Sequence, residues 1–192
     1  MTIESDPLID PGSTGVATAT DTCDPASVVT FTDSVFSETV CPKLFTITRT
    51  WEATDQCGNA STCKQTICVV DTIAPTLITG IVEGGLPQRS MLRSLGFQFS
   101  EDVSASLEPG DLVLENLTTT ETIDPGVMTV TYDSATNTAT WTFNFPGPFF
   151  ESLPDGNYIA TLPAAAVEDR GCNNINDDFI LVFHRLFGDH EG

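Results

Sequence analysis

Two segments of alternating polarity, joined by a tight turn, constrain the fold of this chain more than any other feature. Residues 44–54 and 62–70 place apolar and polar side chains in turn, which is the pattern of a half-buried β-strand. The turn contains Gly58 and Asn59, residue types that favour tight reversals. We therefore expect a β-hairpin, with Trp51 pointing into the core.

The rest of the chain repeats this β pattern. Helix signals are nearly absent, and short alternating runs recur between clusters of Gly, Pro, Asp and Asn, as in all-β sandwiches. The other expected strands are residues 2–4, 16–20, 28–32, 92–100, 112–114, 127–132, 139–145, 157–162 and 179–186. Pro75 cannot donate to a β ladder, so we expect one domain over residues 1–75 and a second over residues 76–192.

The charge of the chain argues against some classes of function, and its cysteine content indicates a cellular compartment. The chain has 27 acidic and 7 basic residues, a net charge of −20, which repels nucleic acids and anionic lipid surfaces. No apolar run has the length of a membrane span. Six cysteines favour an oxidising compartment. Met1 precedes polar residues without the apolar region of a signal peptide, so we interpret the chain as a fragment of a longer exported protein.

Catalytic motifs are scarce in this sequence. The two histidines, His184 and His190, lie in the last nine residues. We find no nucleophile elbow, no phosphate-binding loop and no carboxylate pair with a distinctive spacing. We therefore predict that the chain is not an enzyme.

A specific set of motifs occupies residues 14–24, 47–59, 65–71 and 74–75. It resembles the HYR-like (hyalin repeat) modules of large bacterial surface proteins. That resemblance implies an immunoglobulin-like sandwich that serves in extracellular adhesion or as a spacer.

A second set of motifs occupies residues 88–94, 97–100, 152–158 and 183–189. It resembles the bacterial immunoglobulin-like modules found near the C-termini of planctomycete-type exported proteins. In such proteins dockerin-like calcium repeats commonly follow, and residues 188–192 look like the first part of such a loop.

Together the resemblances imply an all-β chain of two tandem immunoglobulin-like β-sandwiches. The expected function is a noncatalytic structural or adhesion module pair of a secreted or cell-surface bacterial protein, in contact with neighbouring domains. The alternative is a carbohydrate- or surface-polymer-binding module, for which Phe149 and Phe150 are the candidate exposed aromatic residues. Its partner would be a surface protein or a polysaccharide.

The expected disulfides follow from the same resemblance. In an immunoglobulin-like sandwich, the loops that carry Cys23 and Cys57 lie at one end, so Cys23–Cys57 is the preferred bridge. It would stabilise the fold by about 3–4 kcal/mol in the chain-entropy model.

The remaining cysteines leave alternatives open. Cys41–Cys68 is plausible because Cys68 should lie near the start of the preceding strand, and Cys41–Cys63 competes with it. If Cys41 pairs with Cys68, Cys63 would pair with Cys172 or remain free.

Calcium is the cofactor that we consider. In the immunoglobulin-like topology, Asp21, Asp24, Asp55 and Asn59 converge on one loop end, and Asp71 ends the last strand near the linker. Hard oxygen ligands grouped in this way suit Ca²⁺. The alternative is that these residues only cap their own turns, as Asp and Asn commonly do.

Overall fold

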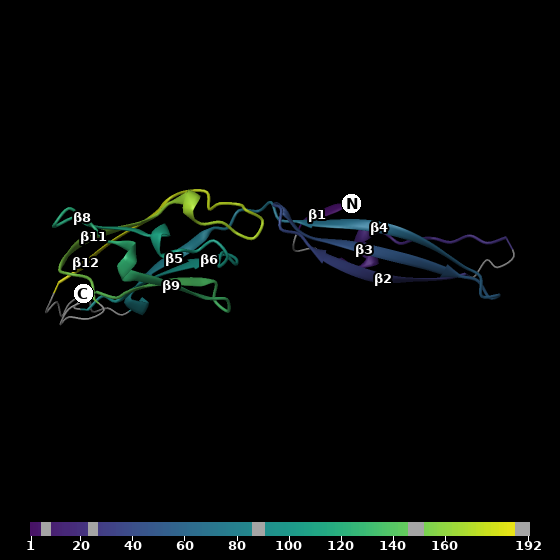
Figure 1. Ribbon diagram of the computed structural model, residues 1–192, viewed down its shortest axis with the longest axis horizontal. Coiled ribbons are helices and arrows are strands. Elements are labelled where there is room, and N and C mark those ends of the chain that lie inside the picture. Colours follow the sequence, from purple (N-terminus) through teal and green to yellow (C-terminus); the bar gives the residue numbers. More distant parts are fainter. Residues whose placement is uncertain (5–8, 23–26, 86–90, 146–151, 187–192) are drawn as a thin grey trace. The chain divides into compact units, whose positions relative to one another are not determined.

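The fold was analysed in a computed structural model, which describes residues 1–4, 9–22, 27–85, 91–145 and 152–186 (Figure 1). The chain divides into two compact units, Met1–Thr72 and Ile73–Gly192, three residues before the expected boundary at residue 75. Regular structure is almost entirely β, which confirms the predicted all-β class. Across the described residues, no helix is both long and apolar enough to cross a bilayer.

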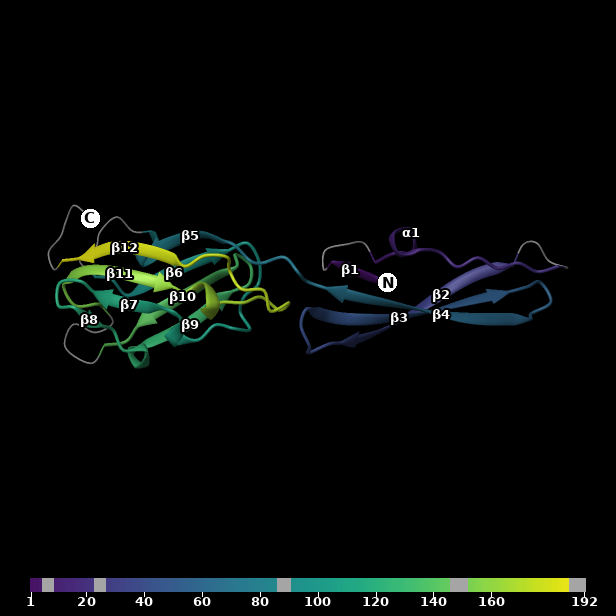
Figure 2. The same ribbon diagram turned by 90° about the horizontal axis from the view of Figure 1, so that it is seen from above.

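In its described residues, unit 1 contains one four-stranded sheet (Figure 2). In spatial order its strands are β1 (Thr2–Glu4), β4 (Ala60–Val70), β3 (Lys43–Thr54) and β2 (Val28–Ser37). The neighbours β2, β3 and β4 are antiparallel, whereas β1 is parallel to β4. The expected hairpin is therefore present as β3 and β4.

One face of this sheet carries the core of unit 1. Alternation along β3 places Ile47, Arg49 and Trp51 on that face, and each is at most 5% exposed. Ile67 and Val69 of β4 lie beside them and are fully buried. The prediction that Trp51 is a core residue is confirmed.

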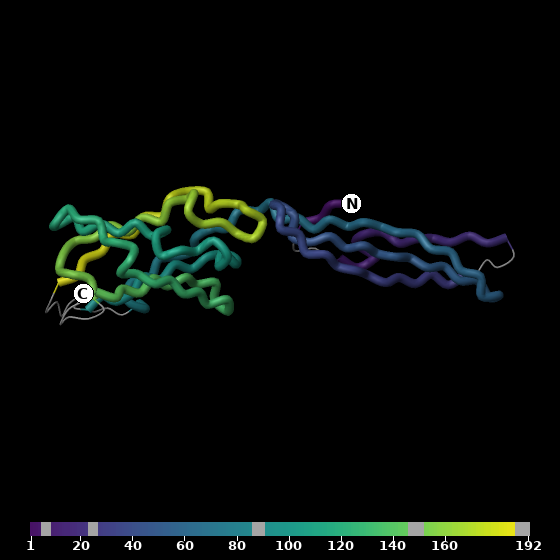
Figure 3. The backbone as a smooth tube through the Cα atoms, viewed as in Figure 1, coloured from purple at the N-terminus to yellow at the C-terminus, as the bar shows by residue number. Residues whose placement is uncertain are grey.

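The segment 9–22 runs along this face (Figure 3). Its one regular element is a single helical turn, α1 (Pro11–Thr14), which begins where the Asp10 carboxylate accepts a 2.7 Å hydrogen bond from the Gly12 amide. The predicted strand at 16–20 is wrong, because this stretch joins no sheet. Side-chain hydrogen bonds from β3 and β4 hold the segment instead of a backbone ladder.

Unit 2 is a sandwich of two four-stranded sheets (Figure 2). The first sheet contains, in spatial order, β5 (Leu77–Val82), β6 (Ser94–Phe99), β10 (Thr138–Phe143) and β9 (Met128–Asp133). The second contains β12 (Phe179–Arg185), β11 (Gly156–Leu162), β7 (Val113–Asn116) and β8 (Glu121–Thr122). Short 3₁₀ turns lie at Glu83–Gly85, Pro109–Asp111, Pro125–Val127 and Ala164–Ala166.

The strand order of unit 2 is immunoglobulin-like. If its strands are lettered A, B, C, C′, D, E, F and G along the chain, the two sheets read A-B-E-D and G-F-C-C′. This is the immunoglobulin arrangement with one added strand beside C. The predicted sandwich is therefore confirmed in this unit.

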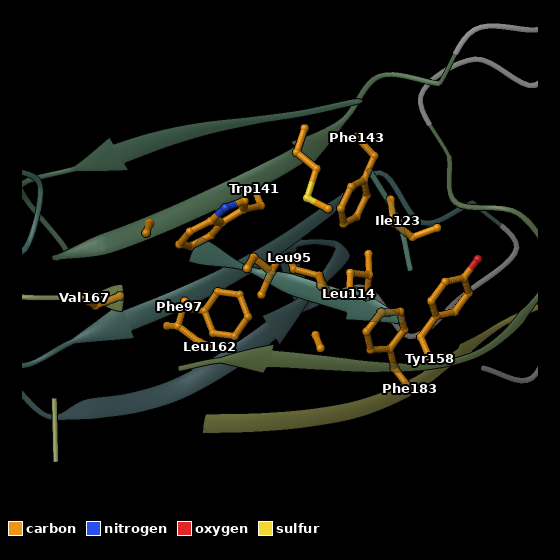
Figure 4. Close-up of a cluster of buried hydrophobic side chains, with 14 of the residues drawn as sticks. Leu95, Phe97, Leu114, Ile123, Trp141, Phe143, Tyr158, Leu162, Val167 and Phe183 are labelled. Atoms are coloured by element: carbon orange, nitrogen blue, oxygen red, sulfur yellow. The ribbon is translucent and has the colours of Figure 1, made fainter. Parts of the chain in front are cut away.

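The core of unit 2 fills the space between its two sheets (Figure 4). Alternation along β10 buries Trp141 and Phe143 completely, while β6 contributes Leu95 and Phe97. The rings of Phe97 and Trp141 meet edge to face at 5.5 Å. Such pairs add about 0.5–1.5 kcal/mol to the burial of their apolar area.

The strand β5 is absent from the sequence predictions. Gly80 interrupts its apolar pattern, and Ile78 is exposed. The structure gives the reason for the glycine, because a Cβ there would lie 3.0 Å from the ring of Phe179. Close packing against Phe179 therefore favours glycine at a position that reads as a strand break.

Candidate functional site

The turn between β3 and β4 is the centre of the candidate site. Asp55 and Asn59 close it with four backbone and side-chain hydrogen bonds. The Asp55 amide donates to the Asn59 carbonyl (3.0 Å), and the Gly58 amide donates to the Asp55 carbonyl (3.1 Å). The Asp55 carboxylate accepts from the amide of Asn59 and from its Nδ2, both at 2.7 Å. Gly58 has φ 86°, a left-handed conformation that favours glycine.

These bonds set the electrostatics of the turn. The Asn59 side chain and then its backbone amide hold the pKa of Asp55 below its ordinary value, because both stabilise the ionised carboxylate. The carboxylate therefore stays charged at neutral pH and keeps its turn role. The structure favours the interpretation in which Asp55 and Asn59 shape the backbone.

A shallow hollow adjoins this turn and contains further predicted residues. It has a volume of about 150 Å³, and Asp21, Asp55 and Asn59 line it together with Ser27 and Ser61. The structure thus brings together three of the five residues predicted to hold calcium. Whether calcium binds stays a prediction.

The other two predicted calcium ligands stand apart from this hollow or outside the described structure. Asp24 lies outside the described residues. Asp71 directly follows β4, whose eleven residues begin just after Asn59. At about 3.3 Å per strand residue, Asp71 is on the order of 35 Å from the turn. The five residues therefore do not form one site.

The same turn occurs in unit 2. Asp169 and Asn173 repeat the spacing of Asp55 and Asn59, and their hydrogen bonds match one for one. The Asp169 carboxylate accepts from the Asn173 amide and Nδ2, each at 2.9 Å. The left-handed fourth position is Cys172 (φ 62°) in place of Gly58. In both units the sequence has an Asp followed four residues later by an Asn. In this structure that spacing marks a turn that the Asp and Asn close by hydrogen bonds.

Arg49 is the residue whose role the sequence analysis missed. Its side chain is only 1% exposed, and all three guanidinium nitrogens donate hydrogen bonds. Nε and Nη2 donate to the two carboxylate oxygens of Asp33 at 2.8 and 2.9 Å, and Nη1 donates to Thr14 Oγ1 at 2.7 Å. Nη2 also donates to the Ile9 carbonyl at 2.7 Å. Arg49 therefore holds the segment 9–22 on the sheet.

Aromatic rings enclose the Arg49 guanidinium. Its Cζ lies 4.6 Å from the centroid of Phe31 and 5.7 Å from that of Trp51, both within cation–π range. The hydrogen bond from Arg49 lowers the pKa of Asp33. Beyond Trp51 a hollow of about 270 Å³ opens between residues 17–20 and the sheet.

The cysteines of unit 1 depart from the predicted pairing. Cys57, Cys63 and Cys68 are free thiols, and Cys41 is disulfide-bonded. The proposed bridges from Cys41 to Cys63 or Cys68 are therefore wrong. The β3–β4 register places Cys63 opposite Trp51 and Cys68 opposite Thr46, several residues along the strands from Cys41.

The other predicted bridges also differ from the structure. Cys23 lies outside the described residues, and its expected partner Cys57 is free in an exposed turn. Cys172 is disulfide-bonded, whereas Cys63, the partner considered for it, is a free thiol, which is the other alternative stated for Cys63.

A buried tyrosine fixes one end of unit 2. Tyr158 near the start of β11 donates from its hydroxyl to the Pro154 carbonyl at 2.8 Å and accepts from Asn116 Nδ2 at 3.1 Å. Its ring stacks on Phe183 at 5.4 Å (Figure 4). Burial raises its pKa to about 12. This is the tyrosine corner of immunoglobulin-like domains, in which the hydroxyl bonds backbone a few residues upstream.

Comparisons with known proteins add little beyond the fold. No protein-family model matches the chain, and no curated protein matches it. Among solved structures, it is similar to a titin substructure with a TM-score of 0.37 and 11% identity, over 84% of this chain and 85% of that one. It is also similar to the extracellular cadherin domains 1–5 of protocadherin gamma B2 (TM-score 0.28, 12% identity, 82% and 32% coverage). The immunoglobulin-like assignment rests on strand order and on Tyr158.

Proposed function

We propose that this chain is a noncatalytic structural or adhesion module pair of an exported protein, with a HYR-like first unit that bears tension. Its partners would be the neighbouring domains of the same protein and a surface protein or polysaccharide. The observation that carries the proposal is the parallel pairing of β1 with β4. These are the strands through which the chain enters unit 1 and leaves it for unit 2.

The register makes this pair resist shear. Thr2, Ile3 and Glu4 pair with Cys68, Val69 and Val70, the last residues of β4. Because the strands are parallel, tension on the two ends of unit 1 pulls along both strands and loads their hydrogen bonds together. In an unzipping geometry, by contrast, the bonds would break one at a time.

Side-chain bonds extend the pair beyond its last ladder residue. Glu4 Oε2 accepts from the Thr72 amide at 3.1 Å, and Glu4 Oε1 accepts from Thr72 Oγ1 at 2.6 Å. Further back, the Cys68 amide donates to the Met1 carbonyl at 2.8 Å. Bonds therefore tie the N-terminal strand to the exit of unit 1 along the whole overlap.

Disulfide chemistry supports export. Cys41 and Cys172 are each disulfide-bonded, and protein disulfides persist mainly in oxidising compartments outside the cytosol. The strongly acidic charge balance is compatible with a soluble extracellular role.

Single-molecule force measurements test the proposal. With handles at the two ends of the chain, we expect unit 1 to unfold at a clearly higher force than with handles at Val28 and Thr54. Those two residues are paired at one end of the antiparallel β2–β3 ladder, so that geometry unzips it. Equal forces in the two geometries would overturn the proposal.

A matched pair of variants isolates the β1–β4 contact. Glu4→Ala removes the two bonds to Thr72 and should lower the unfolding force of unit 1. Glu38→Ala removes one bond, from Thr46 Oγ1 at 2.7 Å, in the same unit but away from β1. That control should leave the force unchanged, and an equal drop in both variants would argue against the shear contact.

A calcium-dependent ligand-binding module is the second candidate function. The observation that favours it is the hollow lined by Asp21, Asp55 and Asn59. Phe149 and Phe150, the aromatic residues expected for a carbohydrate-binding version, lie outside the described residues. A glycan array, read with and without Phe149→Ala, tests that version directly.

Thermal melting with Ca²⁺ or with chelator tests the calcium site. An ion that binds only the folded state of unit 1 must raise the melting temperature of that unit. The calcium-dependent candidate requires a rise of several degrees for unit 1 that Asp21→Asn abolishes and Asp124→Asn, at an exposed cap in unit 2, retains. The absence of any shift would remove this candidate.

A further inference from the structure

The outer edge of β2 is exposed and poorly protected against pairing. Within the described structure, β2 ends the sheet of unit 1 and has a strand neighbour on one side only. Natural edge strands are usually short, bulged, or marked by Lys or Pro, because an open edge is a template for another strand. Over its ten residues, β2 has no Lys, Pro or Gly.

Apolar side chains project from both faces of β2. Phe31 (43% exposed) and Val35 (62%) lie on the core face, opposite Trp51 and Ile47. Phe36 (69%) lies on the other face. The one charged side chain, Asp33, is bound by Arg49. The edge therefore offers backbone groups, apolar side chains and no free charge.

We propose that β2 pairs with β2 of a second copy of this chain, antiparallel, about a two-fold axis at Thr32. A second copy of the chain is the expected partner because the sequence of β2 is nearly symmetric about Thr32. Val28 would face Phe36, Val29 would face Val35, and Thr30 would face Ser34 of the other copy. Cross-strand pairs of this kind stabilise antiparallel sheets, and Phe31 would lie opposite an Asp33 already neutralised by Arg49.

Other alignments of the two β2 strands are less favourable than the one centred on Thr32. A one-residue slip turns every side chain to the opposite face, so only registers centred on a residue keep the core faces together. Centring on Asp33 places two carboxylates opposite each other, and like charges there are destabilising. Centring on Phe31 or Ser34 shortens the overlap from nine residues to seven. Among the registers centred on a residue, only the Thr32 register combines the nine-residue overlap with apolar matches and no carboxylate facing a carboxylate.

The net charge of the chain makes the predicted dimerisation depend on salt concentration. Each copy carries a formal charge of −20, so two copies repel each other at low ionic strength. Added salt screens that repulsion, while the β2 contact itself is uncharged. The dimer should therefore tighten as NaCl is raised, the opposite of an interface held by ion pairs.

Analytical ultracentrifugation of the whole chain at increasing protein and NaCl concentrations tests the proposal. We expect a reversible dimer whose Kd rises at least tenfold in Val35→Lys. Val182→Lys, on the edge strand β12 of unit 2 where Val182 is 66% exposed, should change Kd less than twofold. A monomer under all conditions, or equal weakening by both variants, would overturn the proposal.

Two further measurements test the interface without depending on the folding of the Val35→Lys variant. In the unaltered chain, hydrogen exchange at the β2 amides should be slower in concentrated than in dilute solution; unchanged exchange in a dimer would place the interface elsewhere. Thr32→His places two imidazoles together at the axis, so Zn²⁺ should tighten that dimer at least tenfold. Thr30→His is the matched control, and an equal zinc effect there would rule out this register.

Discussion

Arg49 and Asp33 face each other across β3 and β2 in a two-pronged ion pair, with Arg49 Nε 2.8 Å from Asp33 Oδ1. The arginine side chain is 1% exposed and the aspartate 26%. Removing one partner of a buried pair leaves the other without its counter-charge. We expect Arg49→Met to destabilise unit 1 by about 2–3 kcal/mol, less than for a fully buried pair because Asp33 keeps some water.

The measurement is denaturant unfolding followed through Trp51, in a Trp141→Phe background so that unit 1 alone is seen. Arg93→Met is the control, followed through Trp141 in a Trp51→Phe background, since Arg93 is 48% exposed and pairs with Glu83 in unit 2. A loss in Arg49→Met no larger than in Arg93→Met would contradict the assignment.

Acid should weaken unit 1 through Asp33. The hydrogen bond from Arg49 lowers the pKa of Asp33 in the folded state. A depressed folded pKa contributes stability above the unfolded pKa, near 4, and that contribution is lost as pH falls through the folded pKa. The free energy of unfolding should therefore decline below about pH 4. Asp33→Asn should show a shallower decline, and an identical slope would contradict the prediction.

Alkali should weaken unit 2 through Tyr158. Its folded pKa is raised from 10.0 to about 12, chiefly by burial. A raised folded pKa contributes stability that is complete below the unfolded value and lost as pH rises through the folded one. Between pH 10 and 12, unit 2 should lose about 2–3 kcal/mol.

Unfolding of unit 2 can be followed through Trp141 in a Trp51→Phe background. Tyr158→Phe cannot ionise, so its stability should change less over the same pH range. Tyr132→Phe is the comparison for the other tyrosine, which is half-buried. An alkaline loss that persists unchanged in Tyr158→Phe would contradict the assignment.

Gly156 should not tolerate a side chain. A Cβ there would lie 2.4 Å from Oδ1 of Asn116, whose amide also binds the Tyr158 hydroxyl. We expect Gly156→Ala to destabilise unit 2 by about 1–3 kcal/mol, the usual cost of overpacking. Gly110→Ala is the control, because a Cβ added at Gly110 would meet no atom within 4 Å. Similar melting temperatures for the two variants would disprove the clash.

Alternating polarity predicts most of the strands, because it reports burial of one face of a sheet. The pattern succeeds for β3, β4 and β10, whose buried residues recur at every second position. It fails for residues 16–20, which alternate but are held by side chains rather than by a ladder. It also fails for β5, where Gly80 interrupts the apolar pattern and lies close to the ring of Phe179.

The site was harder to predict than the fold. Arg49 stands between Thr48 and Thr50 and reads as a solvent-facing residue. The same alternation that buries Ile47 and Trp51 puts Arg49 on their face, and this signal could have revealed it. Disulfide pairing depends on distances between strands, which cysteine spacing does not contain. That is why the bridges predicted for Cys57 and Cys68 are wrong, whereas Cys63 is free, as one of the alternatives allowed.

The turn shared by both units has a consequence for the chemistry of its cysteines. Asp at the first position and Asn at the fifth hold the backbone, so the second and third residues differ between the two units, while the fourth keeps a left-handed conformation (φ 86° at Gly58, 62° at Cys172). Unit 1 carries the free, exposed thiol of Cys57 at the third position, whereas unit 2 carries the disulfide-bonded Cys172 at the fourth. The same turn therefore accommodates a free thiol in one unit and a covalent cross-link in the other with the same set of hydrogen bonds.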